Sequence, residues 1–305
     1  MKKKKLQWQC DITQEQLKDE QLILMKLENL YGDALDDCNK ILQNLQDRVD
    51  KGHLTPSLLH QLNYQTALKN QIQTIYNDMY GTVYNSVADY IKQSYEDGIL
   101  QTMYSLHSQA LDIVIPIDQN EIALMAGKDT TKFKLSQNLY ADTLQMANMI
   151  NQLSYEDIAR NLKNRSGQTL NRTLRIARTE AHKANQQAKM ESMSKAKDKG
   201  ADIVKQWDST LDGRTRSTHR ELDGQVREVD GKFKSSKGEA YYPGGFGIAG
   251  EDINCRCTVL EIPRWALDGS DEVTKYAKNE DGTAITLTDG TYYAYYTATD
   301  ASGNE

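Results

Sequence analysis

A stripe of apolar side chains with helical spacing constrains the first half of this chain most strongly. Its members recur at alternating three- and four-residue steps: Leu24, Leu27, Tyr31, Ala34, Cys38, Ile41 and Leu45. Such steps place side chains on one face of an α-helix. Only four prolines occur in the 305 residues, so few positions force a helix to end. The stripe therefore predicts a long amphipathic helix that ends near Gly52, since glycine is favoured just past a helix end.

A second helical stretch follows Thr55 and Pro56, which match a helix N-cap and its first residue. Its stripe contains Leu62, Tyr76, Tyr80, Tyr84, Ala88 and Tyr95. A glycine at position 81 predicts a break or a bend within this stretch. The two stretches together predict a helical hairpin within residues 1–150. Core packing explains a stripe of leucine and tyrosine, and an alternative is that some tyrosines face a neighbouring subunit.

Shorter signals organise residues 112–200. Residues 112–116 favour extended backbone before Pro116, and Asp118 with Glu121 matches a capping box that opens a short helix before Gly127. A helical segment over 158–164 is predicted next, followed by a turn at residues 166–168. A longer helix is expected from about Asn171 to Lys197.

The pattern changes beyond Gly200. A β-prone run at residues 203–207 and another at 258–262 flank a stretch that is rich in Asp-Gly and Gly-Gly turns. This pattern predicts a compact α+β module over residues 151–266. The remaining residues, 267–305, are acidic, and their Asp-Gly pairs and the run 291–297 predict a β-hairpin tail. The fold class is therefore α+β and mostly helical: a long N-terminal helical hairpin region, a compact module with short strands, and the tail.

Composition excludes several classes of protein. Hydrophobic residues make up 38% of the chain, and no run approaches the roughly 20 apolar residues of a membrane-spanning helix, so we expect no membrane span. The basic N-terminus is not followed by the apolar stretch of a secretory signal. The four cysteines have no disulfide-framework spacing, which indicates a reduced, cytoplasmic setting.

Charge is distributed unevenly along the chain. Residues 1–150 carry 14 basic and 19 acidic side chains, residues 151–267 carry 21 and 16, and residues 268–305 carry 2 and 8. Between residues 160 and 199 there are 11 basic side chains and three acidic ones. Such a segment indicates contact with a polyanion such as non-specific double-stranded DNA, although a solvated helix face explains it equally well. The candidate polyanion-binding residues are Arg160, Arg165, Arg172, Arg175 and Lys183.

Three groups of residues in the module occur in a distinctive order. The first is an Arg-Thr-Glu helix segment, the second combines a tryptophan with an Asp-Gly-Arg-Thr-Arg turn and a His-x-x-Leu-Asp-Gly block, and the third is Asn-Cys-Arg-Cys. This ordered set resembles the phage Mu F-like family of head morphogenesis proteins, also called minor head or minor capsid proteins. The residues that carry the resemblance are Arg178, Thr179, Glu180, Trp207, Asp212, Arg214, Thr215, His219, Gly224, Asn254, Cys255 and Cys257.

The resemblance implies a structural protein of a phage or prophage head that is not itself an enzyme. Such a protein would associate with the portal vertex and with packaged or ejected DNA. Its partners would be the portal protein and capsid or scaffold proteins, and residues 1–150 would supply the docking region. It would be located in the virion, in the capsid interior or at the portal vertex, and in the host cytoplasm during assembly.

A possible metal site is indicated by His219, Cys255 and Cys257. Residues two apart on a strand point to the same face, so both thiols could reach one zinc ion together with the imidazole. Structural zinc sites use four ligands, and the fourth would be Asp208, Asp212 or Asp223, because Arg216 stands where some relatives have a cysteine. The alternatives are a histidine bonded to a turn beside two reduced thiols, or a strained disulfide.

Two enzymatic readings compete with a structural one. A metal-dependent nuclease or toxin would be centred on His219, with Asp212 and Asn254 nearby, but the sequence contains no His-Asn-His spacing. An ADP-ribosyltransferase would use the Arg-Thr-Glu segment, but it would also need a Ser-Thr-Ser element and a Glu-x-Glu pair, and the sequence has neither.

Overall fold

The computed structural model separates the chain into two compact units. The helical unit comprises Gln16–Tyr90 and Ala123–Arg178, and the sheet unit comprises Met1–Glu15, Ile91–Ile122 and Thr179–Glu305. The structure describes residues 2–53, 55, 62–111, 113–126, 131, 134–137, 155–210, 213–267, 276–278 and 284–286. The predicted fold class is confirmed: long helices precede a small set of short antiparallel strands.

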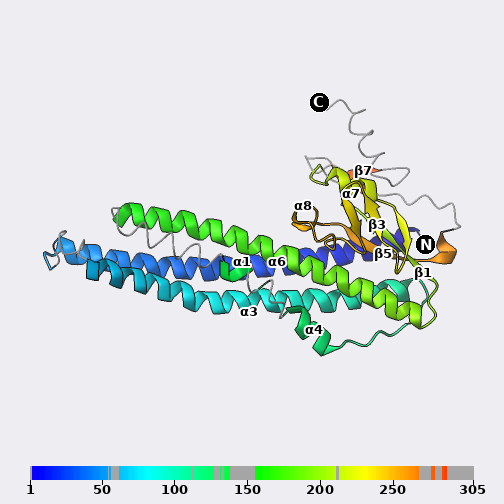
Figure 1. Ribbon diagram of the computed structural model, residues 1–305, viewed down its shortest axis with the longest axis horizontal. Helices are drawn as coiled ribbons and strands as arrows, with labels where there is room; N and C mark the ends of the chain where they lie inside the picture. The colour runs from blue at the N-terminus through cyan, green and yellow to red at the C-terminus, as the bar shows by residue number, and fades with distance from the viewer. Residues whose placement is uncertain are drawn as a thin grey trace, which may run out of the picture. The chain divides into compact units, whose positions relative to one another are not determined.

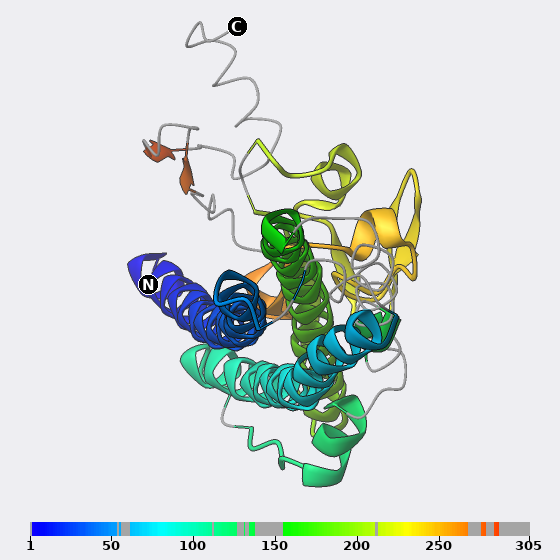
Figure 2. The same ribbon diagram turned by 90° about the vertical axis from the view of Figure 1, so that its left-hand side faces the viewer.

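Three long helices form the helical unit, and each also contributes residues to the sheet unit. They are α1 (Lys2–Asp50), α3 (Leu62–Ser108) and α6 (Tyr155–Asp198). Within the helical unit they lie side by side, as Figure 1 and the end-on view of Figure 2 both show. The buried Tyr31 hydroxyl lies 2.9 Å from the Thr173 hydroxyl and so joins α1 to α6.

The buried face of α1 follows the predicted stripe only in its middle. Leu27, Tyr31, Ala34 and Cys38 are buried as expected. At the two ends the buried positions are Ile23 and Leu42, whereas the neighbouring stripe members are only half-buried. An α-helix has 3.6 residues per turn, so a face followed over several turns drifts away from a 3.5-residue pattern.

The predicted end of the first helix is confirmed. Gly52 has φ +71°, and the N–H of His53 donates to the carbonyl of Arg48 at 2.9 Å. This left-handed residue with a bond back across the last turn is a common way to end a helix. Pro56 and the predicted start of the next helix lie outside the described residues.

Neither a break at Gly81 nor a turn at residues 166–168 interrupts the long helices, so these two predictions are wrong. Helix α3 passes through Gly81 without a break, and α6 passes through residues 166–168, where a turn was expected. Ser166 and Thr169 are buried on the same face as Leu162 and Thr173. Packing of this continuous face outweighs the local turn preference, and an exposed helical glycine costs only about 1 kcal/mol.

Antiparallel strands organise the sheet unit. The strands β1 (Ile203–Asp208), β2 (Val226–Glu228) and β5 (Thr258–Pro263) form one sheet in the order β2-β1-β5, with Trp207 opposite Val259. The strands β3 (Phe233–Ser235) and β4 (Gly238–Ala240) form a hairpin. Two short helices, α7 (Ser217–Leu222) and α8 (Ala249–Asp252), and a 3₁₀ turn (Arg264–Ala266) complete this part (Figure 1).

Helices α3 and α6 approach each other closely inside the sheet unit. A Cβ atom built on Gly98 of α3 would lie 2.5 Å from the backbone oxygen of Asn185 and 2.8 Å from the Cβ of Ala188, both on α6. No side chain fits there. The Asn185 amide also donates to the carbonyl of Ser94 at 3.0 Å. Glycine at position 98 is therefore what permits this contact between the helices.

The short helix α4 (Gln119–Ala126) forms as predicted, but without a complete capping box. The Asp118 carboxylate accepts the N–H of Asn120 at 2.8 Å. The Glu121 carboxylate, which was expected to reach back to the cap, pairs instead with Lys195 of α6 at 2.9 Å. A salt bridge to a neighbouring helix has replaced the second half of the capping box.

The tail contains the expected hairpin, formed by β6 (Tyr276–Lys278) and β7 (Ala284–Thr286) on either side of an Asp-Gly pair. The run 291–297, which was also assigned to it, lies outside the described residues. Among the helices that the structure describes, none combines the length and apolar character needed to cross a membrane.

Candidate functional site: a buried histidine–cysteine cluster

Trp207 on β1 lies at the centre of the residues singled out by the sequence. Its side chain is fully buried. The ring meets the ring of His219 edge-on with 5.7 Å between centroids, and that of Phe233 at 5.2 Å. Its Nε1–H donates to the Ser209 hydroxyl at 3.2 Å, and that hydroxyl donates to the carbonyl of His219 at 2.7 Å. Trp207 thereby fixes the position of α7, which carries the histidine.

The Asp-Gly turn after α7 is tied to the same strand. Gly224 has φ +76°, which only glycine adopts readily, and its N–H donates to the carbonyl of Trp207 at 2.9 Å. The Asp223 carboxylate accepts the N–H of Ser209 at 2.8 Å. Position 223 therefore needs a side chain that accepts a hydrogen bond, and position 224 needs a residue that tolerates a positive φ.

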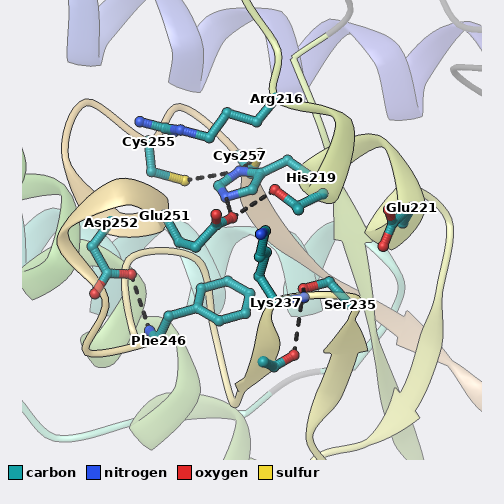
Figure 3. A network of polar contacts seen from close by, with 12 residues as sticks. Arg216, His219, Glu221, Ser235, Lys237, Phe246, Glu251, Asp252, Cys255 and Cys257 are labelled. Carbon is teal, nitrogen blue, oxygen red and sulfur yellow. Dashed lines mark hydrogen bonds and ion pairs between the residues drawn. The ribbon is translucent and has the colours of Figure 1, made fainter.

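The side chains of His219, Cys255 and Cys257 come together beside this turn, and we call them the His219 cluster (Figure 3). Their ligand atoms all lie within 4.8 Å of one another. His219 Nδ1 is 3.2 Å from Cys257 Sγ and 3.7 Å from Cys255 Sγ. All three residues are buried, and the imidazole is only 2% exposed.

The two thiols differ in their affinity for a proton. The pKa of Cys257 lies well below that of an ordinary thiol, chiefly because Cys255 donates a hydrogen bond to it, and its contact with His219 lowers the pKa further, although burial opposes the shift. The pKa of Cys255 is raised by the same hydrogen bond and by burial. Negative charge in the pair is therefore concentrated on the sulfur nearest the imidazole.

Glu251 is a neighbour of the cluster that the sequence did not indicate. Its Oε2 lies 3.2 Å from His219 Nε2, an ion-pair distance at which the two atoms do not form a hydrogen bond. The same oxygen accepts a hydrogen bond from the Thr218 hydroxyl at 2.6 Å. Glu251 belongs to α8, a helix of four residues within a turn-rich stretch, so no periodic pattern could have marked it.

Arg216 has a structural role that its sequence position does not indicate. Its guanidinium donates to the carbonyl of Ile253 and lies near Cys255 in Figure 3. The arginine thus joins the start of α7 to the segment that carries both cysteines. Its charge also favours the ionised form of the Cys255 thiol, which it faces.

The Arg-Thr-Glu segment lies on α6. The Thr179 hydroxyl accepts the N–H of Asn254 at 3.3 Å, so the first and third groups of family residues touch. Asn254 has φ +53°, a backbone conformation that asparagine tolerates better than most residues. Arg178 pairs with Glu20 inside the helical unit, and Glu180 is half-buried.

The remaining residues of the turn are placed as follows. Thr215 is buried, and its hydroxyl donates to the carbonyl of Thr210, whereas Arg214 is exposed. Asp212 lies outside the described residues. Neither Asp208 nor Asp223 joins the His219 cluster, which is the only such group of His, Cys, Asp and Glu among the described residues.

The candidate polyanion-binding residues all lie on α6 but differ in exposure. Arg172 and Arg175 are exposed, whereas Arg165 and Lys183 are half-buried. Arg160 is exposed and forms an ion pair with Asp157 at 3.0 Å. Arg172 and Arg175 therefore offer the most accessible positive charge of the set.

Known proteins with similar sequences support the resemblance to phage head morphogenesis proteins. Residues 142–260 match the family described as Phage Mu protein F like protein. Minor head protein GP7 of Bacillus phage SPP1 is 33% identical over 129 residues, which is 42% of this chain and 40% of that protein. No solved structure matches.

A second relative is named NAD(+)--arginine ADP-ribosyltransferase EFV, from Enterococcus faecalis (strain ATCC 700802 / V583). It is 29% identical over 266 residues, which is 84% of this chain and 54% of the relative. An uncharacterized protein of Haemophilus influenzae is 29% identical over half of this chain and 31% of its own length. The chain thus spans about half the length, or less, of the curated relatives it matches.

Proposed function

Because residues 142–260 form a segment of the phage Mu protein F-like family, we propose that this chain is a minor head protein that acts at the portal vertex during phage head morphogenesis. Its partners would be the portal protein and capsid or scaffold proteins. Its place would be the virion, in the capsid interior or at the portal vertex, after assembly in the host cytoplasm. Minor head protein GP7, named above, supports this assignment.

One observation carries a structural role rather than a catalytic one. The family residues Trp207, His219, Cys255 and Cys257 are all at most 5% exposed, and they contact one another or their neighbours in the chain. A general base must reach the proton it removes, and a buried imidazole cannot reach a nucleic acid. This burial argues against the nuclease or toxin centred on His219, and we propose that the chain has no enzymatic activity.

The ADP-ribosyltransferase name of one relative does not change this proposal. The similarity covers 54% of that protein. The activity in its name therefore belongs to a protein of which almost half lies outside the region similar to this chain. In the present chain Thr179 of the Arg-Thr-Glu segment bonds the backbone of Asn254. That contact gives the segment a packing role.

We propose that residues 1–150 supply the docking region, using the part of α1 that lies in the helical unit. Three apolar side chains there are more than half exposed: Leu17 at 53%, Leu22 at 64% and Met25 at 59%. Leu22 and Met25 are three residues apart and so share one face of the helix, and exposed apolar side chains on one face are typical of protein interaction sites.

Co-expression with the portal protein of the same phage or prophage tests this function. We expect the chain to co-elute with the portal ring, and the double variant Leu22→Asp, Met25→Asp to elute separately. The control is Trp265→Asp, Leu267→Asp, which places two charges at residues that are 59% and 40% exposed outside residues 1–150. Separate elution of the wild-type chain, together with normal head assembly in its absence, would refute the proposal.

We further propose that Arg172 and Arg175 contact double-stranded DNA without sequence preference. Each phosphate contact contributes about 0.9 to the slope of log affinity against log salt concentration. The double variant Arg172→Glu, Arg175→Glu should therefore bind DNA at least about tenfold more weakly, with a slope smaller by about 2. Lys18→Glu, Lys26→Glu makes the same charge change on α1 and should bind as the wild type does; equal losses in both variants would contradict a site on α6.

A further inference from the structure

The His219 cluster has the donor atoms of a metal site. It combines one imidazole nitrogen with two sulfur atoms, all within 4.8 Å of one another and all buried. Thiolate and imidazole ligands together favour zinc among the common divalent ions of cells. The three residues come from α7 and from the segment that leads into β5, so one ion would join two parts of the sheet unit.

The separations between these atoms match those around a zinc ion. Zinc binds nitrogen at about 2.0–2.1 Å and sulfur at about 2.3 Å in tetrahedral geometry, which places a nitrogen and a sulfur ligand about 3.5 Å apart. His219 Nδ1 lies 3.2 Å from Cys257 Sγ and 3.7 Å from Cys255 Sγ. Both nitrogen–sulfur separations would therefore admit a shared ion with shifts of a few tenths of an ångström.

The surroundings of the imidazole favour the tautomer that a metal needs. Glu251 Oε2 lies 3.2 Å from Nε2, so its charge favours a proton on that nitrogen and leaves the lone pair of Nδ1 directed at the two sulfurs. Glu251 is itself held by the Thr218 hydroxyl. A carboxylate behind the second nitrogen of a metal-binding histidine is a recurrent arrangement.

We infer that His219 Nδ1 and the thiolates of Cys255 and Cys257 bind a structural zinc ion, with Glu251 as a positioning residue. The ion neutralises two buried thiolates, which would otherwise be costly to ionise. Asp208 and Asp223 do not join the cluster. Since these described carboxylates stay outside the cluster, a water molecule would complete the fourth position. This inference does not depend on the proposed function.

The test uses the full chain, purified with a thiol reductant and without chelator. We expect about one zinc ion per chain by elemental analysis. A chelator should lower the melting temperature, and added zinc should restore it, because an ion that binds only the folded chain stabilises it. Cobalt in place of zinc should give the charge-transfer absorption of a thiolate–cobalt complex.

Matched cysteine variants localise the ion. Cys255→Ser and Cys257→Ser should lose the zinc and the cobalt absorption. Cys38→Ser removes another buried thiol, in the helical unit, and should retain both. Glu251→Gln should retain the absorption but bind zinc about 10–100-fold more weakly, as expected for a residue behind a ligand.

The wild-type chain alone can overturn the inference, even where a cysteine variant fails to fold. The inference is refuted if the folded wild-type chain contains no stoichiometric zinc and its melting temperature responds to neither chelator nor zinc. Cys255 and Cys257 would then be only a hydrogen-bonded pair of thiols. Retention of the cobalt absorption in both cluster variants would refute the assignment equally.

Discussion

The two units bury different kinds of polar side chain. In the described part of the helical unit, the buried polar residues other than tyrosine are all serine or threonine: Ser86, Thr131, Ser166, Thr169 and Thr173. In the sheet unit they also include lysine, glutamate, histidine and amide side chains, such as Lys189, Lys205 and Glu261. A buried hydroxyl can use a nearby backbone carbonyl, as Ser86 does with Thr82 at 2.7 Å. Buried charged and amide groups need partners from elsewhere in the chain.

The two cores are therefore held together in different ways. Lys205 donates to the carbonyl of Tyr241 at 2.8 Å and lies over the rings of Phe233 and Tyr241. Glu261 of β5 accepts a hydrogen bond from the Thr102 hydroxyl of α3 at 3.0 Å. Substitutions in the sheet unit should therefore depend on particular partners, whereas those in the helical unit should depend mainly on volume and helix propensity.

The largest effect is expected for Trp207→Ala in the sheet unit. It removes the central aromatic ring and the hydrogen bond to Ser209, so we expect the free energy of unfolding to fall by about 3–5 kcal/mol. Urea unfolding followed by circular dichroism measures this loss. Ile23→Val in the helical unit is a milder control and should cost only about 0.5–1.5 kcal/mol. Equal losses from both substitutions would remove the contrast between the units.

An intermediate effect is expected for Gly98→Ala. The added Cβ meets the backbone of Asn185 at 2.5 Å, so α3 and α6 must separate, and we expect a loss of about 1–3 kcal/mol. The melting temperature measures it. An unchanged melting temperature would mean that the two helices do not approach so closely in solution.

The smallest effect, with the opposite sign, is expected for Gly167→Ala. This glycine lies inside α6 in the helical unit, and a Cβ atom there would meet nothing within 4 Å. Alanine should stabilise the helix by about 0.5–1 kcal/mol, seen as a higher melting temperature. If alanine instead lowers the melting temperature, residues 166–168 form a turn in solution, as the sequence predicts, and not a continuous helix.

The sequence could predict the helical core because a periodic stripe is a local property of the chain. Leu27 and Cys38 were assigned to the core from spacing alone, and both are buried. Local propensity alone wrongly predicts a break at Gly81 and a turn at Ser166, because it does not include the tertiary packing that keeps these helices continuous.

The candidate site was only partly accessible to the same reasoning. The order of motif residues grouped His219 with the two cysteines, and the structure brings them together. Glu251 and the close approach at Gly98 escaped notice, because each depends on a residue far away in the sequence. Neither a four-residue helix nor a single glycine leaves a pattern from which such a contact can be derived.

The cysteines lie in both units, so their reactivity can report local unfolding of each unit. Cys38 is buried in the helical unit, and Cys255 and Cys257 are buried in the sheet unit. A buried thiol reacts with an alkylating reagent only when its surroundings transiently open. In a Cys10→Ser background, with zinc removed by a chelator, the rate at which each cysteine peptide gains mass would therefore report how often the unit around it opens.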